Sequence, residues 1–264
     1  MYDFIPDIIC SAAKIMLSAH DIDSTVIAKE GSANFVTRFD VAVEEFLTEK
    51  LLSAMPDAVV IGEESDDNHT ELLGSRISII MDPIDGTTNF IHNYRYSAIS
   101  VGICDKGEMV YGAVLDPYAG RLYHAEKGCG AFVRDTSNGV DYAIAVSERS
   151  LVESLLGFGT SPYYREELGK NTFDAVYTLF GICRDVRRSG SAALDLCNVA
   201  AGALDVFFEY RLSPWDYAAA SLIIKEAGGV ITQIDGTEIT LDASCSVTAG
   251  NMKAHRELLD RKIL

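Results

Sequence analysis

Two aspartates stand three residues apart in the stretch MDPIDGTTNF, Met81 to Phe90, directly after the apolar run ISIIM. One interpretation is an ordinary turn, because Asp-Gly is a strong turn signal and Pro83 fixes the φ angle after Asp82. The other is catalytic: the carboxylates of Asp82 and Asp85 bind a cation, and the amides of the following Gly-Thr-Thr bind an anion. The rest of the chain must decide between them.

Further carboxylates also stand at the ends of apolar segments. VVIGEES places Glu63 and Glu64 at the end of a predicted strand, and SPWDYAAA places Asp216 at the start of a helix rich in small residues. Taken singly, Glu63 fits a solvated strand end, Asp85 a turn, and Asp216 a helix N-cap. If these carboxylates converge with that of Asp82, their repulsion raises their pKa values unless cations neutralise them. An all-oxygen site without His or Cys favours Mg²⁺ over Mn²⁺ or Ca²⁺, and it argues against zinc.

Several Mg²⁺ ions beside an anion site are typical of enzymes that hydrolyse phosphate esters. Such ions would also let a protein of formal net charge −17 receive an anionic substrate. The one basic cluster, CRDVRRSG, contains Arg184, Arg187 and Arg188. A solvated face is the commoner explanation for such a cluster, and a phosphate-facing role is the alternative.

The elements that position these residues follow from the spacing of apolar side chains. Amphipathic helices are predicted over 1–20 and 40–55. Strands are predicted over 58–64, 77–82, 96–105, 108–116, 121–128 and 130–133. The connections between the last four strands are short, which indicates antiparallel pairing. Asp82 is expected to be the last residue of its strand.

The character of the chain changes to mixed α/β after Ser147. Helices are predicted near 171–180, 191–202 and 215–229, and strands over 204–210 and 230–235. The last of these helices ends at Gly228-Gly229, as a C-cap should. No repeat or linker divides the chain. We therefore expect a single α/β domain over 1–264, with halves of approximately 1–145 and 146–264 and a largely antiparallel first sheet.

Composition limits the classes of protein and of partner. A chain of 264 residues that is 48% hydrophobic can bury a large core without disulfides. The six cysteines show no metal-ligand spacing, which favours reduced thiols and a cytoplasmic location. The sequence has no signal-peptide pattern and no apolar run long enough to cross a bilayer, so no membrane association is expected. The acidic charge argues against general nucleic-acid binding.

Three segments, IGEES, DPIDGTTNF and PWDYAAASLIIKEAGG, resemble in order the signature motifs of the inositol monophosphatase family of Mg²⁺-dependent, lithium-sensitive phosphatases. The stretches NFVTRFD, YHAEKGCGAF, RRSGSAALDLC and DVFFEY resemble the segments between those motifs. The resemblance implies a layered α/β sandwich of alternating helix and sheet layers, like that of inositol monophosphatase and fructose-1,6-bisphosphatase. It also implies a homodimer that hydrolyses a small phosphomonoester by direct attack of water.

The resemblance implies two or three Mg²⁺ ions. Carried over residue by residue, the first ion would be held by Glu63, Asp82 and the carbonyl of Ile84. The second would be held by Asp82, Asp85 and Asp216. Glu63 would also face a weaker third ion.

The same likeness assigns the remaining catalytic roles. Thr87 and Asp40 match the pair that orients the attacking water and helps to deprotonate it. The amides of Gly86 and Thr87 would bind the phosphate. Lys29 matches a family lysine near the third ion, although an exposed loop lysine is the simpler interpretation.

For the alcohol half of the substrate, the matching residues are Asp85, Gly190, Ser191, Ala192 and Glu209. A surface glutamate after a buried strand is an equally good interpretation of Glu209. The sequence departs from the animal enzymes at Ser213, where they have a histidine, so inositol specificity stays open.

The expected substrate is inositol 1-phosphate or a related polyol or sugar phosphate. Relatives with the same metal core act on fructose 1,6-bisphosphate, 3′-phosphoadenosine 5′-phosphate or histidinol phosphate, and these are the alternatives. The compact chain lacks the insertions usual in nucleotide-specific relatives. An alternative of another class is a regulatory binding partner with low turnover.

Overall fold

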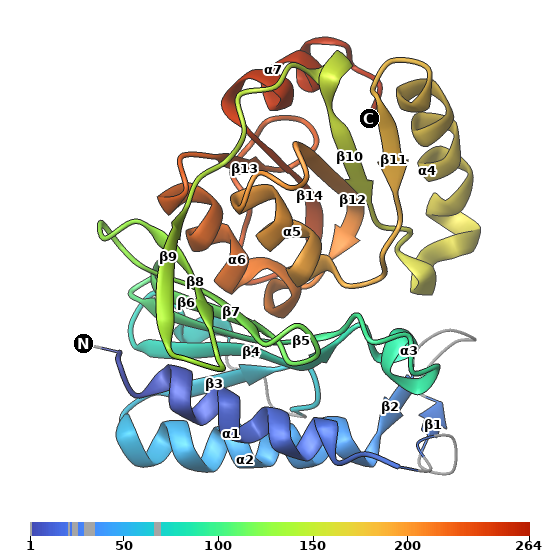
Figure 1. The fold of residues 1–264 in the computed structure, drawn as a ribbon. Helices are drawn as coiled ribbons and strands as arrows, with labels where there is room; N and C mark the ends of the chain where they lie inside the picture. The colour runs from blue at the N-terminus through green and yellow to red at the C-terminus, as the bar shows by residue number, and fades with distance from the viewer. Residues whose placement is uncertain (1, 21, 23–25, 29–34, 66–69) are drawn as a thin grey trace.

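The computed structural model describes residues 2–20, 22, 26–28, 35–65 and 70–264, so Lys29 and its predicted role lie outside the described residues. Helix and sheet layers alternate through the molecule (Figure 1). This arrangement confirms the layered α/β fold. The layers are, in order, α1 (Ile5–Leu17) with α2 (Arg38–Ala54) at the bottom of Figure 1, a seven-stranded sheet, α5 (Ala192–Ala200) with α6 (Pro214–Glu226), and a five-stranded sheet. The outer face of the five-stranded sheet is covered by α7 (Met252–Asp260), at the top of the view, and α4 (Arg165–Phe180), at its right.

The seven-stranded sheet is largely antiparallel, as the short connections predicted. Its first two strands, β3 and β4, are parallel, and every later neighbour pairs antiparallel. The last strand, β9, is not among the predicted strands. In order across the sheet the strands are β3 (Val59–Gly62), β4 (Ile77–Asp85), β5 (Ala98–Asp105), β6 (Glu108–Asp116), β7 (Arg121–Glu126), β8 (Ala131–Asp135) and β9 (Val140–Ile144).

Strand β4 runs through the acidic motif and does not end before it. Asp82 pairs with Ser100 and Asp85 with Ala98, with a register irregularity between the two aspartates. The prediction that the strand ends at Asp82 is therefore wrong. Pro83 cannot donate a ladder hydrogen bond, and an irregularity in the pairing is where a strand tolerates proline.

The five-stranded sheet is mixed. β12 pairs parallel with β10 and antiparallel with β14. The sequence did not predict β10, β11, β14 or α7, and α4 begins at Arg165, earlier than the predicted start near 171. In order across the sheet the strands are β11 (Asp185–Arg187), β10 (Leu155–Phe158), β12 (Val206–Leu212), β14 (Cys245–Gly250) and β13 (Val230–Thr232).

The remaining elements of the described chain are short. They are the antiparallel pair β1 (Val26–Ala28) and β2 (Phe35–Thr37), the short helix α3 (Thr87–Ile91), and the 3₁₀ turns η2 (Thr70–Leu72), η3 (Leu151–Glu153) and η4 (Pro162–Tyr164).

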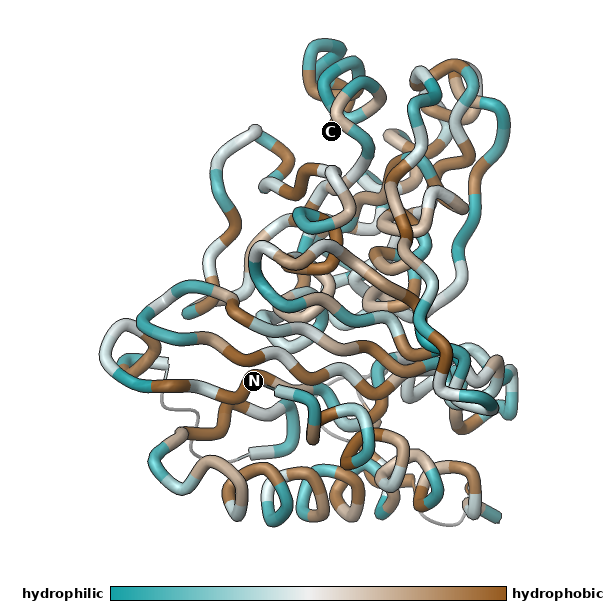
Figure 2. Tube along the Cα trace, turned by 60° about the vertical axis from the view of Figure 1, so that its left-hand side comes forward, coloured by the Kyte–Doolittle hydropathy of each residue, from teal (hydrophilic) through white to brown (hydrophobic). Residues whose placement is uncertain are grey.

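Helix α6 lies directly on the large sheet. A Cβ added at Gly112 in β6 would come within 2.4 Å of the carbonyl oxygen of Ala219, so a side chain there would push the helix away. Apolar residues of α5 and α6 pack against both sheets and form one apolar cluster between them. The helices below the large sheet instead alternate apolar and polar residues (Figure 2), because only one of their faces is covered. This packing fixes where the first turn of α6, with Asp216, meets β4.

Two predictions from composition can be compared with the structure. All six cysteines are free thiols, and four of them are buried, whereas Cys129 is exposed. Among the described residues, no helix has the length and the apolar character needed to cross a membrane.

Candidate active site

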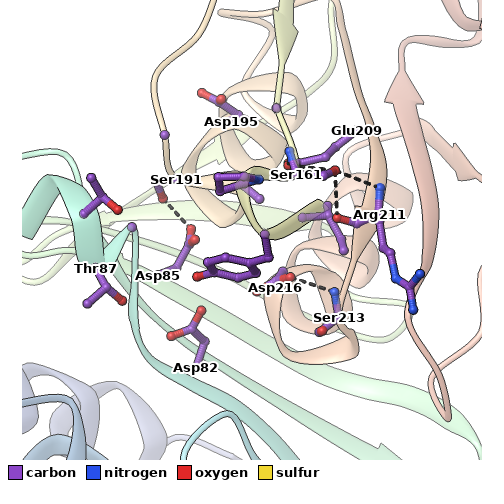
Figure 3. Close-up of a pocket in the computed structure, with 18 of the residues that line it drawn as sticks. Asp82, Asp85, Thr87, Ser161, Ser191, Asp195, Glu209, Arg211, Ser213 and Asp216 are labelled. Carbon is purple, nitrogen blue, oxygen red and sulfur yellow. Dashed lines mark hydrogen bonds between the residues drawn. The ribbon is translucent and has the colours of Figure 1, made fainter. Parts of the chain in front are cut away.

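Three aspartates meet where the end of β4 faces the start of α6 (Figure 3). One carboxylate oxygen from each of Asp82, Asp85 and Asp216 lies within 4.8 Å of the others. Asp82 and Asp85 are buried, at 1% and 7% exposure. The structure thus brings together three of the four carboxylates singled out in the sequence. The fourth, Glu63, follows β3 and lines the same cavity.

Local hydrogen bonds hold two of these carboxylates in place. Oδ1 of Asp82 accepts a hydrogen bond from the amide of Ile84 at 2.9 Å, across the irregular part of β4. Asp216 is the third residue of α6, and its Oδ2 accepts the amide of Ser213 at 2.7 Å. The N-cap interpretation of Asp216 is therefore wrong, because Ser213 is the N-cap and Asp216 completes its capping box.

Asp85 connects the two halves of the chain. Its Oδ2 accepts hydrogen bonds from the hydroxyl of Ser191 at 2.5 Å and from the amide of Ala193 at 2.8 Å. Both donors lie at the start of α5, where backbone amides have no partner within the helix. The predicted substrate loop at Gly190–Ala192 is thus held against the acidic cluster.

Burial and mutual repulsion make these carboxylates hard to ionise in the absence of a cation. Burial, then the charges of Glu63, Asp85 and Asp216, raises the pKa of Asp82 well above its usual range. Burial, then Asp85 and Glu63, does the same to the pKa of Asp216. Burial raises the pKa of Asp85 to about 6, although the Ser191 hydroxyl lowers it. A compact group of carboxylate oxygens with raised pKa values can hold a hard divalent cation.

Thr87 and Asp40 lie within reach of each other beside this cluster. The hydroxyl of Thr87, the first residue of α3, is 3.1 Å from the carbonyl oxygen of Ile84 and 3.3 Å from Oδ1 of Asp40. Asp40 is fully buried, and its Oδ2 accepts the amide and hydroxyl of Thr37 at 2.9 and 2.5 Å. One oxygen of Asp40 therefore caps α2, and the other is available to Thr87.

The sharp turn at Gly86 places α3 against the loop that precedes α5. Gly86 has a φ of 88°, and an added Cβ would lie 3.0 Å from the carbonyl oxygen of Gly190. Only glycine adopts this conformation at this contact without strain.

A cavity of about 350 Å³ contains the acidic cluster. Asp40 lies behind Thr87 and is not part of its lining, nor is Glu64. The predicted site residues that line the cavity are Glu63, Asp82, Ile84, Asp85, Gly86, Thr87, Gly190, Ser191, Ala192, Glu209 and Asp216.

Glu209 is buried, so its interpretation as a surface glutamate is wrong. It is 6% exposed, and burial raises its pKa to about 7. Its Oε1 accepts the amide of Ser161 at 2.6 Å. An added Cβ at Gly159 would lie 1.8 Å from Oε2, so the backbone directly after β10 passes over this carboxylate. Glu209 therefore holds in place the segment that follows β10 and forms part of the cavity wall.

The cavity also contains residues that sequence analysis did not single out. Ser161, Tyr163, Tyr164, Asp195 and Arg211 all line it. The two tyrosines belong to the segment SPYY, and no local sequence pattern marks them as site residues.

Two arginines of the basic cluster, Arg187 and Arg188, have different surroundings in the structure. Arg188 lines the cavity, whereas Arg187 pairs with Asp185 at 2.5 Å on an exposed edge of the small sheet. The solvated interpretation fits Arg187, and the cluster contributes only Arg188 to the cavity lining.

The motifs and the geometry agree with comparisons against known proteins. The model of the inositol monophosphatase family matches residues 4–263. The chain belongs to the inositol monophosphatase family. It is 34% identical to the inositol-1-monophosphatase of Bacillus subtilis (strain 168) over 250 residues, which are 95% of this chain and 91% of that protein. It is 35% identical to the Nus factor SuhB of Escherichia coli (strain K12) over 238 residues, 90% of this chain and 85% of that protein.

Solved structures of this family share the fold. The extragenic suppressor protein SuhB of Bartonella henselae superposes with a TM-score of 0.88 at 28% identity, covering 99% of this chain and 97% of that one. SaIMPase-II bound to inositol monophosphate gives a TM-score of 0.82 at 28% identity, covering 100% and 94%. As a member of the inositol monophosphatase family, this chain is a phosphatase.

Proposed function

We propose that this phosphatase is a Mg²⁺-dependent phosphomonoesterase that acts on inositol 1-phosphate or a related polyol or sugar phosphate. The observation that supports this most directly is the convergence of Asp82, Asp85 and Asp216 within 4.8 Å beside Thr87. The inositol monophosphate bound to SaIMPase-II supports the substrate class.

The proposed metal ligands are all oxygen donors. Glu63, Asp82 and the carbonyl of Ile84 hold one Mg²⁺, and Asp82, Asp85 and Asp216 hold a second. Glu63 also faces a weaker third ion. When bound, Mg²⁺ neutralises the carboxylates, polarises the phosphoryl oxygens and makes water a better nucleophile. The raised pKa values of Asp82 and Asp216 suit this role. Burial and neighbouring negative charges destabilise their ionised forms, and a bound cation would remove that destabilisation.

In the proposed reaction, Thr87 and Asp40 take the proton of the attacking water. The Thr87 hydroxyl oxygen accepts this proton while its own proton passes to Oδ1 of Asp40, which lies 3.3 Å away. Burial raises the pKa of Asp40, which makes its carboxylate a better base. The amides of Gly86 and Thr87 orient the phosphate.

The alcohol half of the substrate lies between Asp85 and the second half of the chain. Asp85 and Glu209 accept hydrogen bonds from its hydroxyls. The turn at Gly190, Ser191 and Ala192 forms the adjacent wall, since Ser191 is already held by Asp85.

The test is phosphate release from a substrate panel. Inositol 1-phosphate, fructose 1,6-bisphosphate, 3′-phosphoadenosine 5′-phosphate and histidinol phosphate are compared by kcat/KM with Mg²⁺ and with EDTA. Activity should require Mg²⁺, and millimolar Li⁺ should inhibit it. Full activity in EDTA would contradict the metal assignment, and an unchanged rate across a lithium titration would contradict lithium sensitivity.

The alternative of a regulatory binding partner with low turnover is favoured by one observation, the relatives named Nus factor SuhB. The intact set of site residues argues for turnover, because a binding role needs none of these carboxylates. Phosphate release with Mg²⁺ separates the two. Negligible release from every substrate by folded protein would favour the binding role.

We also propose that the protein is a cytoplasmic homodimer with a single domain over 1–264. The exposed face of α4 supports the dimer, since Phe173, Tyr177 and Phe180 are 59%, 82% and 57% exposed at helical spacing. Light scattering should give twice the chain mass, and Tyr177→Glu should shift the protein toward monomer. A wild-type monomer at micromolar concentration would contradict the dimer.

A further inference from the structure

We propose that Arg188 and Arg211 form a second anion-binding subsite, so that the preferred substrate is a polyol or sugar with two phosphate groups. This inference rests on the proposed phosphomonoesterase function and narrows its substrate class. One phosphate is hydrolysed at the acidic cluster, and the other is bound by the arginines.

Both arginines belong to the same cavity as the acidic cluster. They are the two cationic residues among the described residues that line it. Arg188 follows β11, and Arg211 lies in β12. In Figure 3, Arg211 lies on the opposite side of the view from Thr87, with Asp85 and Asp216 between them. Because Thr87 and Arg211 line the same cavity, a substrate bound in that cavity can contact both of them.

One short segment after β10 holds both arginines. Nη2 of Arg188 donates a hydrogen bond to the hydroxyl of Thr160 at 3.3 Å. The next residue, Ser161, accepts the amide of Arg211 at 3.1 Å. The Arg211 guanidinium lies 4.2 Å from the centre of the Tyr164 ring. Stacking on an aromatic ring orients a guanidinium and leaves its N–H groups at the edge for a ligand.

The carboxylates nearest to this part of the cavity have donors of their own. Asp195 accepts hydrogen bonds from the hydroxyls of Tyr96, at 3.2 Å, and Ser189. Glu209 accepts the amide of Ser161 at 2.6 Å. Within the described part of the chain, no ion pair within 4.0 Å includes either arginine.

Guanidinium groups suit a phosphate because their planar donors match two of its oxygens at once. In a chain of formal net charge −17, two arginines that line the substrate cavity and pair with no carboxylate of the described residues are best explained by an anionic ligand. The competing explanation is charge balance, since the charge of Arg188 lowers the pKa values of Asp85, Asp195 and Glu209. Charge balance would affect every substrate alike, whereas a subsite affects only those with a second anion.

The experiment compares Arg188→Gln and Arg211→Gln with the wild type on inositol 1-phosphate and fructose 1,6-bisphosphate. Wild type should prefer the bisphosphate in kcat/KM. In each variant, the loss on the bisphosphate should exceed the loss on the monophosphate by roughly tenfold or more, because a charged hydrogen bond is removed. Arg256→Gln, on an exposed side chain of α7, is the matched control and should change neither value. Thermal melts check that each variant is folded.

Equal losses on both substrates in the two variants would overturn the subsite in favour of charge balance. A wild type without preference for the bisphosphate would also overturn it. If the wild type hydrolyses none of the esters with Mg²⁺, the proposed function fails separately. Titration of fructose 1,6-bisphosphate then still decides the subsite: weaker binding to the arginine variants supports it, and equal binding overturns it.

Discussion

Oδ2 of Asp85 accepts a hydrogen bond from the hydroxyl of Ser191 at 2.5 Å, although 106 positions separate them in the sequence. The same oxygen accepts the amide of Ala193 at 2.8 Å. A proposed metal ligand at the end of β4 thus also holds the start of α5. A change in the charge of Asp85 should therefore alter both the proposed metal site and the position of the loop proposed to contact the substrate.

The first prediction concerns Asp85→Asn. The amide oxygen can still accept the bonds from Ser191 and Ala193, but the charge and a metal ligand are lost. We expect Mg²⁺-dependent phosphate release to fall by more than about a hundredfold, with little change in melting temperature. Asp260→Asn, on an exposed side chain of α7, is the control. A kcat near the wild-type value in folded Asp85→Asn would rule out the metal assignment.

The second prediction concerns Thr87, whose hydroxyl lies between the Ile84 carbonyl and Asp40. Thr87→Ala should slow every substrate in kcat by a similar factor, roughly 10²–10⁴, because the attacking water is common to all of them. Thr87→Ser keeps the hydroxyl and should restore most of the rate. Asp40→Asn is a poorer probe, since Asp40 also caps α2 through Thr37.

The comparison for Thr87 is made on inositol 1-phosphate and an aryl phosphate. If Thr87→Ala lowered kcat for only one of these substrates, or if Thr87→Ser were inactive, the Thr87 hydroxyl would not be the group that activates the attacking water.

Sequence analysis could predict the acidic cluster because each carboxylate follows a strong local signal. Asp82 directly follows the apolar run ISIIM, Asp85 stands before Gly-Thr-Thr, and Asp216 lies at the start of a helix of small residues. The contact between Asp85 and Ser191 has no such signal, because it depends on how α5 packs between the two sheets. The same holds for Arg211, which reaches the cavity only through the placement of β12.

The elements missed in the second half are short or have little periodicity. β10 and β11 contain four and three residues, too few to show an alternating pattern. α4 begins with the polar stretch at Arg165, and its early residues are mostly exposed, so apolar spacing marks only its later turns. The sequence left Glu209 ambiguous for a similar reason, because nothing near it in the sequence shows that the segment after β10 covers it.

The third prediction concerns stability and pH. Asp195 is 3% exposed, and burial raises its pKa from 3.8 to about 7. Between these two values the folded chain holds this proton and the unfolded chain does not. The free energy of unfolding should therefore fall as the pH rises through this window.

Asp195→Asn cannot ionise, so its stability should depend less on pH. The difference in unfolding free energy between pH 5 and pH 8 should shrink by up to about 2.7 kcal/mol, because about two pKa units of the window lie above pH 5, at about 1.36 kcal/mol per unit. The measurement is urea unfolding in EDTA, with Asp174→Asn on an exposed side chain of α4 as the control. The same pH difference in Asp195→Asn and wild type would show that Asp195 ionises in the folded protein as it does in the unfolded chain.

The last prediction asks whether Glu209 recognises the alcohol half of the substrate. Its Oε1 accepts the amide of Ser161, and a glutamine oxygen can keep that bond in Glu209→Gln. The negative charge that would bind substrate hydroxyls is lost. We expect kcat/KM for inositol 1-phosphate to fall about ten- to a hundredfold, from the loss of roughly 1.5–3 kcal/mol. An aryl phosphate has no hydroxyls for Glu209 to hold, so it should lose much less.

The pH dependence adds a second readout for the same variant. Because the pKa of Glu209 is raised to about 7, its carboxylate ionises as the pH rises through this value. The wild-type preference for inositol 1-phosphate over the aryl phosphate should therefore increase between pH 6 and pH 8, and this increase should be absent in Glu209→Gln. Equal losses on both substrates, with the increase retained, would mean that Glu209 only supports the segment at Ser161 and does not contact the substrate.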